Sequence, residues 1–334
     1  MSVNAPELLL DSGADAGAVA LVPGEIAARS PAQLFWRRLR ADRVAMVSGI
    51  FLIVLILVAI AAPLVVKLLG VPGPNVQDPN TLDAFGSPTG PSGAHPFGVD
   101  QIGRDVLSRV IYGARVSLEV GLSGTAIATA IGTVIGLVAG FFGRWVDTLL
   151  MRMVDVFLAF PVIVFGLGIG DACGVRGCLK AFGTELIQPG LATVIFIIAL
   201  SSFTYIARIV RGQVLSIREK EFVEAARSLG ASNRRILFKE ILPNLLAPLI
   251  VYSSLLIPTN ILLEAALSFL GVGVRPPTAS WGQMISDAGN DILGTTPAWW
   301  YMVFPGVALL LTVLAFNLLG DGLLDALNPR SNRS

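Results

Sequence analysis

The sequence has 334 residues, of which 54% are hydrophobic and only 14% are charged, and its mean hydropathy is +0.74. This charge content is too low to cover the surface of a soluble domain, so the composition places the chain among membrane proteins. The formal net charge of +1 gives no field that would attract nucleic acid or an acidic substrate.

Residues 1–43 are predicted to form a cytoplasmic tail. The first 30 residues are acidic and rich in small side chains, and they lack the basic and then apolar segments of a secretory signal peptide. We expect this stretch to be disordered, or to hold at most a short surface helix over residues 5–10.

Six apolar runs are long enough to cross a bilayer, which takes about 20 helical residues. We expect transmembrane helices over residues 44–66, 116–142, 149–169, 191–207, 245–270 and 299–319. The predicted fold class is therefore an all-α membrane protein with six transmembrane helices. The last five form a core over residues 116–322, and residues 323–334 form a second cytoplasmic tail.

The positions of Lys and Arg orient these helices, because basic residues accumulate on the cytoplasmic side. With the N-terminus inside, 17 of the 24 basic residues fall in cytoplasmic segments. Both termini and the loop at residues 208–243 are then predicted to be cytoplasmic.

The first outer segment, residues 67–115, divides into two parts. Residues 71–96 are rich in Pro and Gly and predict irregular structure. Residues 100–112 predict an amphipathic helix along the membrane surface, with an apolar face formed by Ile102, Val106, Val110 and Ile111. His95 also lies in this segment. One histidine and two cysteines are too few for a multi-ligand Cys/His metal site, so no metal site is expected.

Small residues recur at every fourth position of the second apolar run, where they let two helix backbones approach closely in lipid. They are Gly124, Ala128, Gly132, Gly136 and Gly140. Packing within the chain is the favoured interpretation, and a subunit interface is the alternative.

The outer loops hold two further features. Cys173 and Cys178 lie on the oxidising side, where a structural disulfide and a pair of free thiols are equally open. Trp299 and Trp300, at the edge of the last outer loop, are expected to be interfacial anchors, with a ligand-stacking role as the alternative.

Acidic residues at membrane depth are candidates for function because burying them is costly. For each of them we favour a structural pairing or a helix-end role over contact with substrate. They are Glu119, Asp155, Glu264, Asp321 and Asp325. The sequence holds no acid–histidine chain that would indicate a proton relay.

The segment over residues 218–244 is charged and helix-prone, and it is too polar to lie in lipid. Its apolar residues recur at helical spacing and predict one apolar face, formed by Phe222, Ala225, Ala226 and Leu229. Gly230 then ends the helix, Ser232 can cap a second one, and Pro243 closes the unit. Such a short amphipathic unit has no core of its own, so we expect it to dock on a soluble partner.

Several catalytic motifs are missing from the sequence: a Walker-type loop, an HExxH pair and a nucleophile elbow. The chain is therefore not expected to hydrolyse ATP, to act as an enzyme, or to hold a cofactor.

The stretch EAARSLGASNRRILFKEILPN resembles the EAA loop of the membrane subunits of ABC importers. Glu224-Ala225-Ala226, Gly230 and Leu242-Pro243 stand at the expected distances, whereas Glu240 replaces a residue that is apolar in many members. Residues 30–330 resemble the C-type permease subunit of the dipeptide, oligopeptide and nickel importer family. Matching stretches include HPFGVDQIGRDVLSRVIYGARVSL at residues 95–118 and LLEAALSFLGVGVRPPTASWGQM at residues 262–284. The first forty residues, the loop around residue 80 and the cysteine-bearing insert follow no family pattern.

The resemblance implies the type I ABC importer permease architecture, in a bacterial or archaeal cell membrane, surrounded by lipid. Its implied partners are a second, B-type permease, two ATPase subunits that bind ATP and Mg²⁺, and an extracytoplasmic solute-binding protein. The helix over residues 219–229 would dock on one ATPase. The residues implied in this coupling are Glu221, Phe222, Glu224, Ala225, Ala226, Leu229, Gly230, Leu242 and Pro243.

Di- or oligopeptides are the expected cargo, and nickel, glutathione or an oligosaccharide are alternatives within the family. A secondary carrier is a rival from another class, but it predicts an inverted repeat or an unpaired acid at mid-membrane, and neither is evident. An intramembrane enzyme would need a catalytic constellation that the sequence lacks.

Overall fold

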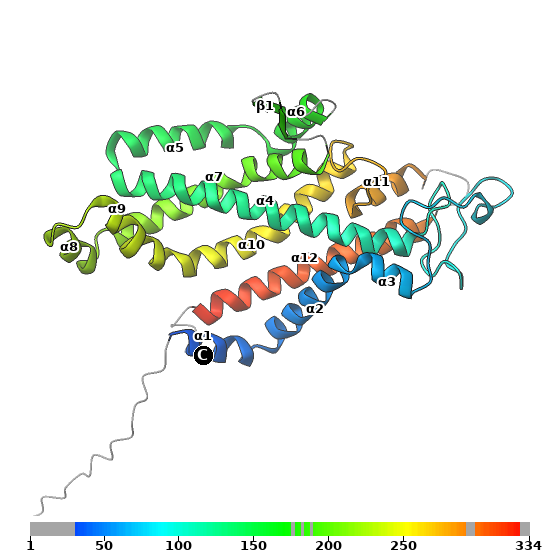
Figure 1. Cartoon of the computed structure of the whole chain (residues 1–334), viewed down its shortest axis with the longest axis horizontal. Helices are drawn as coiled ribbons and strands as arrows, with labels where there is room; N and C mark the ends of the chain where they lie inside the picture. The colour runs from blue at the N-terminus through cyan, green and yellow to red at the C-terminus, as the bar shows by residue number, and fades with distance from the viewer. Residues whose placement is uncertain (1–30, 175–177, 182–183, 188–189, 292–297, 328–334) are drawn as a thin grey trace, which may run out of the picture.

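The computed structural model describes residues 31–174, 178–181, 184–187, 190–291 and 298–327. Its described residues form a bundle of long helices that run side by side along the long axis of the molecule (Figure 1). A two-stranded hairpin is the exception to the helical structure, so the predicted all-α membrane class is confirmed. The predicted tails fall largely on residues 1–30 and 328–334, outside the described residues.

Within the described part of the chain, five helices are long and apolar enough to cross a membrane by themselves. They are α2 (Arg43–Ile60), α4 (Val106–Phe142), α7 (Leu191–Ile217), α10 (Leu242–Phe269) and α12 (Trp299–Leu327). A sixth crossing exists if α5 (Arg144–Ala159) and α6 (Val162–Gly174) count as one span. These two are bent by 84° where the sequence predicts one straight helix. Pro161 explains the break, because it has no N–H and forces Phe160 into an extended conformation.

The remaining elements are short. They are α1 (Pro31–Ala41), α3 (Ala62–Leu68), the 3-10 turn η1 (Pro79–Thr81), strands β1 (Cys178–Ala181) and β2 (Thr184–Ile187), α8 (Glu221–Ser228), α9 (Asn233–Arg235), the π-helical turn η2 (Ile236–Ile241) and α11 (Trp281–Asp291). β1 and β2 pair antiparallel. α8 lies at one end of the bundle, hereafter the α8 end, and α11 lies toward the other, the α11 end (Figure 1).

The predicted surface helix over residues 100–112 is wrong. Asp105 caps the N-terminus of α4 by accepting a hydrogen bond from the backbone N–H of Ser108 at 2.7 Å, so the helix begins at Val106. From there it continues without a break through the second predicted span. The residues before it form a tight loop, which a bridge between Val99 and Asp105 closes.

α7 also departs from its prediction, since it runs ten residues past the expected end at residue 207. Arg208 and Arg211 do not end the helix, because both form ion pairs with aspartates of α5. Paired arginines can lie at membrane depth where isolated ones would be costly.

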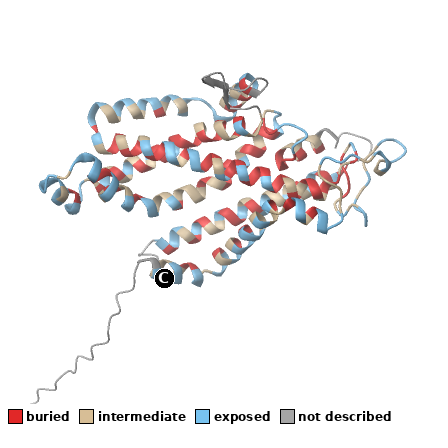
Figure 2. Ribbon diagram, viewed as in Figure 1, coloured by how far each residue is buried: buried red, intermediate tan, exposed pale blue. Residues whose placement is uncertain are grey.

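α4 and α7 make the most extensive packing in the molecule. The small residues of α4 face α7, and a methyl group at Gly136 would lie 2.5 Å from the carbonyl oxygen of Ala207. A methyl group at Gly132 would lie 2.6 Å from the carbonyl oxygen of Phe203. The close approach that the four-residue spacing predicts therefore takes place within the chain. Figure 2 shows buried residues gathered along these two helices, while α5 and α8 are largely exposed.

Tryptophan side chains fasten the loops at the α11 end. Trp300 donates a hydrogen bond from Nε1 to the carbonyl of Val99 at 3.0 Å and packs on Gly98, so it holds this loop in place. Trp299 is exposed, as an anchor would be. Trp281 is fully buried, and its Nε1 donates to the carbonyl of Val110 at 3.0 Å.

Candidate coupling site and charged groove

α8 is attached to the bundle through a small apolar contact. Val223 is fully buried and packs in a cluster with Ile236 and Ile241 of η2. Ala226 is partly buried against the same cluster. The sequence placed Ala226 on the docking face, but in the structure its side chain supports α8 from within.

The outer surface of α8 leaves apolar side chains in the open. Leu229 is 88% exposed and Phe222 is 40% exposed, and Ala225 between them is exposed as well. Glu221 and Glu224 flank this surface and are also exposed. A short helix that buries one valine and exposes a leucine and a phenylalanine presents an apolar surface with an acidic border.

The turn after α8 is built as the sequence predicts. Gly230 has a φ of +77°, a left-handed conformation that glycine adopts without strain. The backbone N–H of Ala231 donates to Ala226 and that of Gly230 donates to Arg227, which together close the helix end. Ser232 then caps the next helix, since its hydroxyl accepts from the N–H of Arg235 at 3.5 Å.

This turn is joined to α10 without a flexible link. The helical path from Asn233 to Phe269 is continuous through η2. Pro243 has no N–H to donate to the preceding turn, and the N–H of Leu242 instead reaches back five residues to Leu237. Leu242 and Pro243 thus lie within one continuous helical segment that joins the α8 turn to the bundle.

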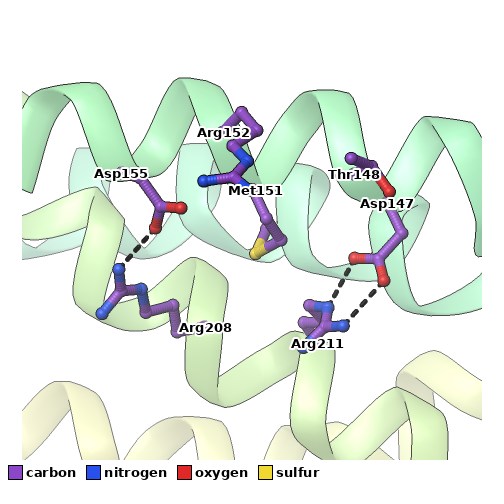
Figure 3. A pocket seen from close by; sticks show the side chains of 7 residues that line it. All are labelled: Asp147, Thr148, Met151, Arg152, Asp155, Arg208 and Arg211. Atoms are coloured by element: carbon purple, nitrogen blue, oxygen red, sulfur yellow. Dashed lines mark hydrogen bonds and ion pairs between the residues drawn. The ribbon is translucent and has the colours of Figure 1, made fainter.

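A second feature is a charged groove between α5 and α7, with a cavity volume of about 370 Å³. Figure 3 shows the side chains that line it: Asp147, Thr148, Met151, Arg152, Asp155, Arg208 and Arg211. Arg211 donates two hydrogen bonds to Asp147, at 2.5 and 2.7 Å, and Arg208 donates one to Asp155 at 2.6 Å. Arg152 lies between these ion pairs on α5 and has no ion pair of its own among the described residues.

Sequence reasoning found only Asp155 of this groove. The arginines were used only to orient the helices, and Asp147 falls between two predicted spans. The available signal was the spacing: Asp147 and Asp155 are eight residues apart on one helix, and Arg208 and Arg211 are three residues apart on another. Both spacings place the paired groups on one helical face.

The other acidic candidates divide into buried and exposed groups. Glu264 is fully buried and accepts hydrogen bonds from the hydroxyls of Ser117 at 2.9 Å and Ser268 at 2.7 Å. It therefore joins α4 and α10. Glu119, Asp321 and Asp325 are exposed.

A neighbouring polar network was not anticipated from the sequence. Asn260 of α10 donates to Thr125 of α4 at 2.8 Å and accepts from Ser202 of α7 at 2.7 Å. These bonds join three membrane-spanning helices through buried side chains, which is a common way to fix helix packing in lipid.

His95 and Cys173 were also singled out in the sequence. His95 lies 2.9 Å from a carboxylate oxygen of Asp105, and the described residues contain no cluster of three potential metal ligands. Cys173 is disulfide-bonded, whereas the side chain of Cys178 lies outside the described residues, so the pairing of these two cysteines stays a prediction.

Residues 132–333 match the family model of the binding-protein-dependent transport system inner membrane component, and residues 30–84 match that of the N-terminal TM domain of oligopeptide transport permease C. The first match begins within α4 and includes both the α8 turn and the charged groove. The EAA-like segment therefore lies inside the matched region.

Proteins of similar sequence are also named as permeases of transport systems. The chain is 42% identical, over 90% of its length and 91% of the relative's, to the glutathione transport system permease protein GsiD of Escherichia coli O6:K15:H31. It is 43% identical over the same shares to GsiD of Salmonella paratyphi A. An inward-facing structure of the MetNI methionine ABC transporter is similar in fold, with a TM-score of 0.52 and 20% identity over 66% of this chain and 96% of that one. The chain belongs to the binding-protein-dependent transport system inner membrane component family, and it is a multi-pass permease subunit of an ABC importer with the type I fold.

Proposed function

We propose that this permease imports small peptides, with glutathione and di- or oligopeptides as the substrate class. Relatives that match nine tenths of the chain are named as glutathione permeases, and residues 30–84 match a domain of oligopeptide permeases. Nickel and oligosaccharide transport lack support of this kind.

The proposed complex holds a second permease, two ATPase subunits and an extracytoplasmic solute-binding protein, and ATP and Mg²⁺ bind to the ATPases. The observation that carries this proposal is the exposed apolar surface of α8, formed by Phe222, Ala225 and Leu229. An ATPase groove that covers this surface would remove it from water and would place Glu221 and Glu224 against a basic border.

Movement of the ATPases would reach the membrane through two contacts. Val223 transmits displacement of α8 to η2, and the closed turn at Gly230 transmits it to the continuous rod from Asn233 to Phe269. That rod carries Asn260 and Glu264, which hold α4. The push on α8 is therefore expected to tilt α10 and α4 together.

In this proposal the α8 end is cytoplasmic and the α11 end faces the binding protein. α1 packs against the last turns of α12, where Arg38 donates to the carbonyl of Ala326 at 3.5 Å. Figure 1 shows both on the same side of the bundle as α8. Both chain ends would then lie in the cytoplasm, in agreement with the distribution of basic residues.

Affinity purification of the tagged chain in mild detergent tests the proposal. We expect a second permease and ATPase subunits to co-purify, with ATP hydrolysis stimulated by a binding protein loaded with glutathione or a dipeptide. Stimulation by nickel or an oligosaccharide alone would overturn the substrate class. Recovery of the chain without ATPases and without nucleotide turnover would overturn the proposed complex.

A further inference from the structure

α1 has two sides, and its inner side is used within the chain. Leu39 is buried in a cluster with Ala45 of α2 and Ala326 of α12. Phe35 is partly buried against the same cluster. α1 is therefore fixed against the ends of α2 and α12 that lie on the α8 side of the bundle (Figure 1).

The outer side of α1 gathers a tryptophan and two arginines. Trp36 is 54% exposed, and Arg37 and Arg40 are exposed as well. Together with Gln33 they line a groove with a cavity volume of about 460 Å³. The guanidinium of Arg40 lies 5.5 Å from the centre of the Trp36 ring, which is a cation–π contact. Neither arginine forms an ion pair within the described part of the chain, so both positive charges are directed toward the surroundings of α1.

The sequence after α1 fixes its level relative to the bilayer. Residues 44–66 hold no charged side chain and are bounded by Arg43 and Lys67. A span needs about 20 such residues, so this stretch has little room to slide, and Arg43 lies at the edge of the hydrocarbon core. Val44 and Val47 are 55% and 68% exposed and begin the lipid-facing side of α2. Because α1 packs against this end of α2, its outer side lies at the level of the lipid headgroups.

Positive charge is concentrated at this level. Residues 37–43 hold four arginines and one acid, Asp42. The carboxylate of Asp42 accepts hydrogen bonds from the backbone N–H groups of Val44 at 2.9 Å and Ala45 at 3.1 Å, so it is engaged in capping α2. A basic cluster directly beside a span attracts anionic lipids, and a tryptophan at the same level is typical of the membrane interface.

A phosphate group is the anion that suits this groove. Guanidinium groups bind phosphate oxygens through paired, charge-assisted hydrogen bonds, and two of them line the groove. A free phosphate ion would use the same groups, but it has no apolar part for the ring of Trp36 and the exposed valines of α2. A phospholipid has both parts, and its headgroup lies at the level of α1.

We propose that the outer side of α1 binds the headgroup of an anionic phospholipid, with the phosphate at Arg37 and Arg40 and the ring of Trp36 in the headgroup layer. A lipid held there joins α1 to the leaflet in which α2 begins. The inference does not rest on the proposed function, because it holds for any cargo and for any coupling partner.

Equilibrium binding of fluorescent phosphatidylglycerol to the full chain in a mild non-ionic detergent tests the site. The variant Arg37→Gln/Arg40→Gln removes both guanidinium groups. Arg234→Gln/Arg235→Gln is the matched control, because these two arginines are also exposed and lie at the α8 end. We expect the first variant to bind about thirtyfold more weakly, since each arginine near an anionic surface contributes about fivefold, and the control to lose less than about threefold. Equal losses in the two variants would overturn the inference.

Competition separates an anionic lipid from the other possible ligands. Unlabelled phosphatidylglycerol should displace the probe, whereas phosphatidylcholine and inorganic phosphate at the same concentration should not. Equal displacement by inorganic phosphate would mean a simple anion site. Equal displacement by phosphatidylcholine would mean lipid contact without recognition of charge, and either result would contradict the proposal.

Thermal unfolding in lipid nanodiscs keeps the test valid if a variant is less stable. Phosphatidylglycerol nanodiscs should raise the unfolding midpoint of the unsubstituted chain and of the control above their values in phosphatidylcholine nanodiscs. The Arg37→Gln/Arg40→Gln variant should show no such gain. Each variant is compared with itself in two lipids, so its basal stability cancels. A gain that persists in the Arg37→Gln/Arg40→Gln variant would show that the lipid acts elsewhere and would overturn the inference.

Discussion

The two ends of the bundle differ in where their polar and apolar groups find partners. At the α11 end, Trp281 and Trp300 donate to backbone carbonyls of other segments, and Gln101 donates to the carbonyl of Asp287 at 2.9 Å. At the α8 end, Leu229 is 88% exposed and Phe222 is 40% exposed. The difference teaches that the loops of the α11 end are held by contacts within the subunit, whereas the outer surface of α8 is left to the partner that we propose for it.

This comparison predicts that mutations at the two ends will differ in their effect on stability. Substitutions at the α11 end should lower the stability of the isolated chain, while substitutions on the outer surface of α8 should leave stability unchanged and abolish coupling. The expected effects on stability fall from Trp281→Ala to Phe222→Ser, and the two loop variants that test transport follow.

Trp281→Ala is expected to have the largest effect. It removes a fully buried indole and its hydrogen bond to Val110, so we expect a loss of about 3–5 kcal/mol in the free energy of unfolding. Thermal unfolding of the detergent-solubilised chain measures this loss, with the exposed Trp299→Ala as the control. Equal midpoints for the two variants would mean that the α11 end is not a packed unit.

Glu264→Leu tests the polar link between α4 and α10. It leaves the hydroxyls of Ser117 and Ser268 without their acceptor, so we expect a loss of about 1–3 kcal/mol. Glu264→Gln keeps an acceptor and should be milder. The same thermal assay compares them, and a leucine variant as stable as the glutamine variant would show that these bonds do not stabilise the helix packing.

Trp300→Phe should have a smaller effect, because it keeps an aromatic ring on Gly98 and removes only the hydrogen bond to Val99. We expect about 1 kcal/mol. Hydrogen exchange at the amides of residues 95–105 should rise in this variant. Unchanged exchange would show that packing alone holds the loop.

Phe222→Ser should change stability by less than about 0.5 kcal/mol, because the side chain is on the surface. The neighbouring Val223→Ser removes a buried group and should destabilise the loop. We expect Phe222→Ser to lose the co-purifying ATPases while its unfolding curve matches that of the unsubstituted chain. Retained ATPases would place the docking surface elsewhere.

Glu224→Lys and Gly230→Asp should abolish transport while the protein stays in the membrane. A methyl group at Gly230 would meet nothing within 4 Å, so its φ of +77° is the feature that favours glycine there, and a side chain at this position strains the turn. Uptake assays with membrane quantification check this expectation. Normal import by either variant would contradict the coupling role of the loop.

Sequence reasoning recovered the features that depend on local patterns. The α8 helix, the glycine turn at Gly230 and the cap at Ser232 follow from short-range chemistry, and so do the membrane spans. It failed where a distant partner decides the outcome. α7 continues past Arg208 because Asp155, 53 residues earlier, neutralises it, and Trp300 turns inward because the loop at Val99 offers a carbonyl.

The charged groove illustrates the same limit. Its ion-paired residues are more than fifty positions apart in the sequence, and their meeting depends on the packing of α5 on α7. The sequence shows Pro161 but does not give the angle between α5 and α6. That angle is set by the elements against which the two helices pack.

The central claim is that α8, at the cytoplasmic end, docks on an ATPase, and site-specific photocrosslinking tests it most directly. Leu229 and Phe85 are both apolar and highly exposed, at 88% and 94%, but they lie on α8 and in the loop of the opposite end. A photoreactive amino acid at position 229 should capture an ATPase subunit, and one at position 85 should capture none. Capture of an ATPase from position 85, or none from position 229, would contradict the account.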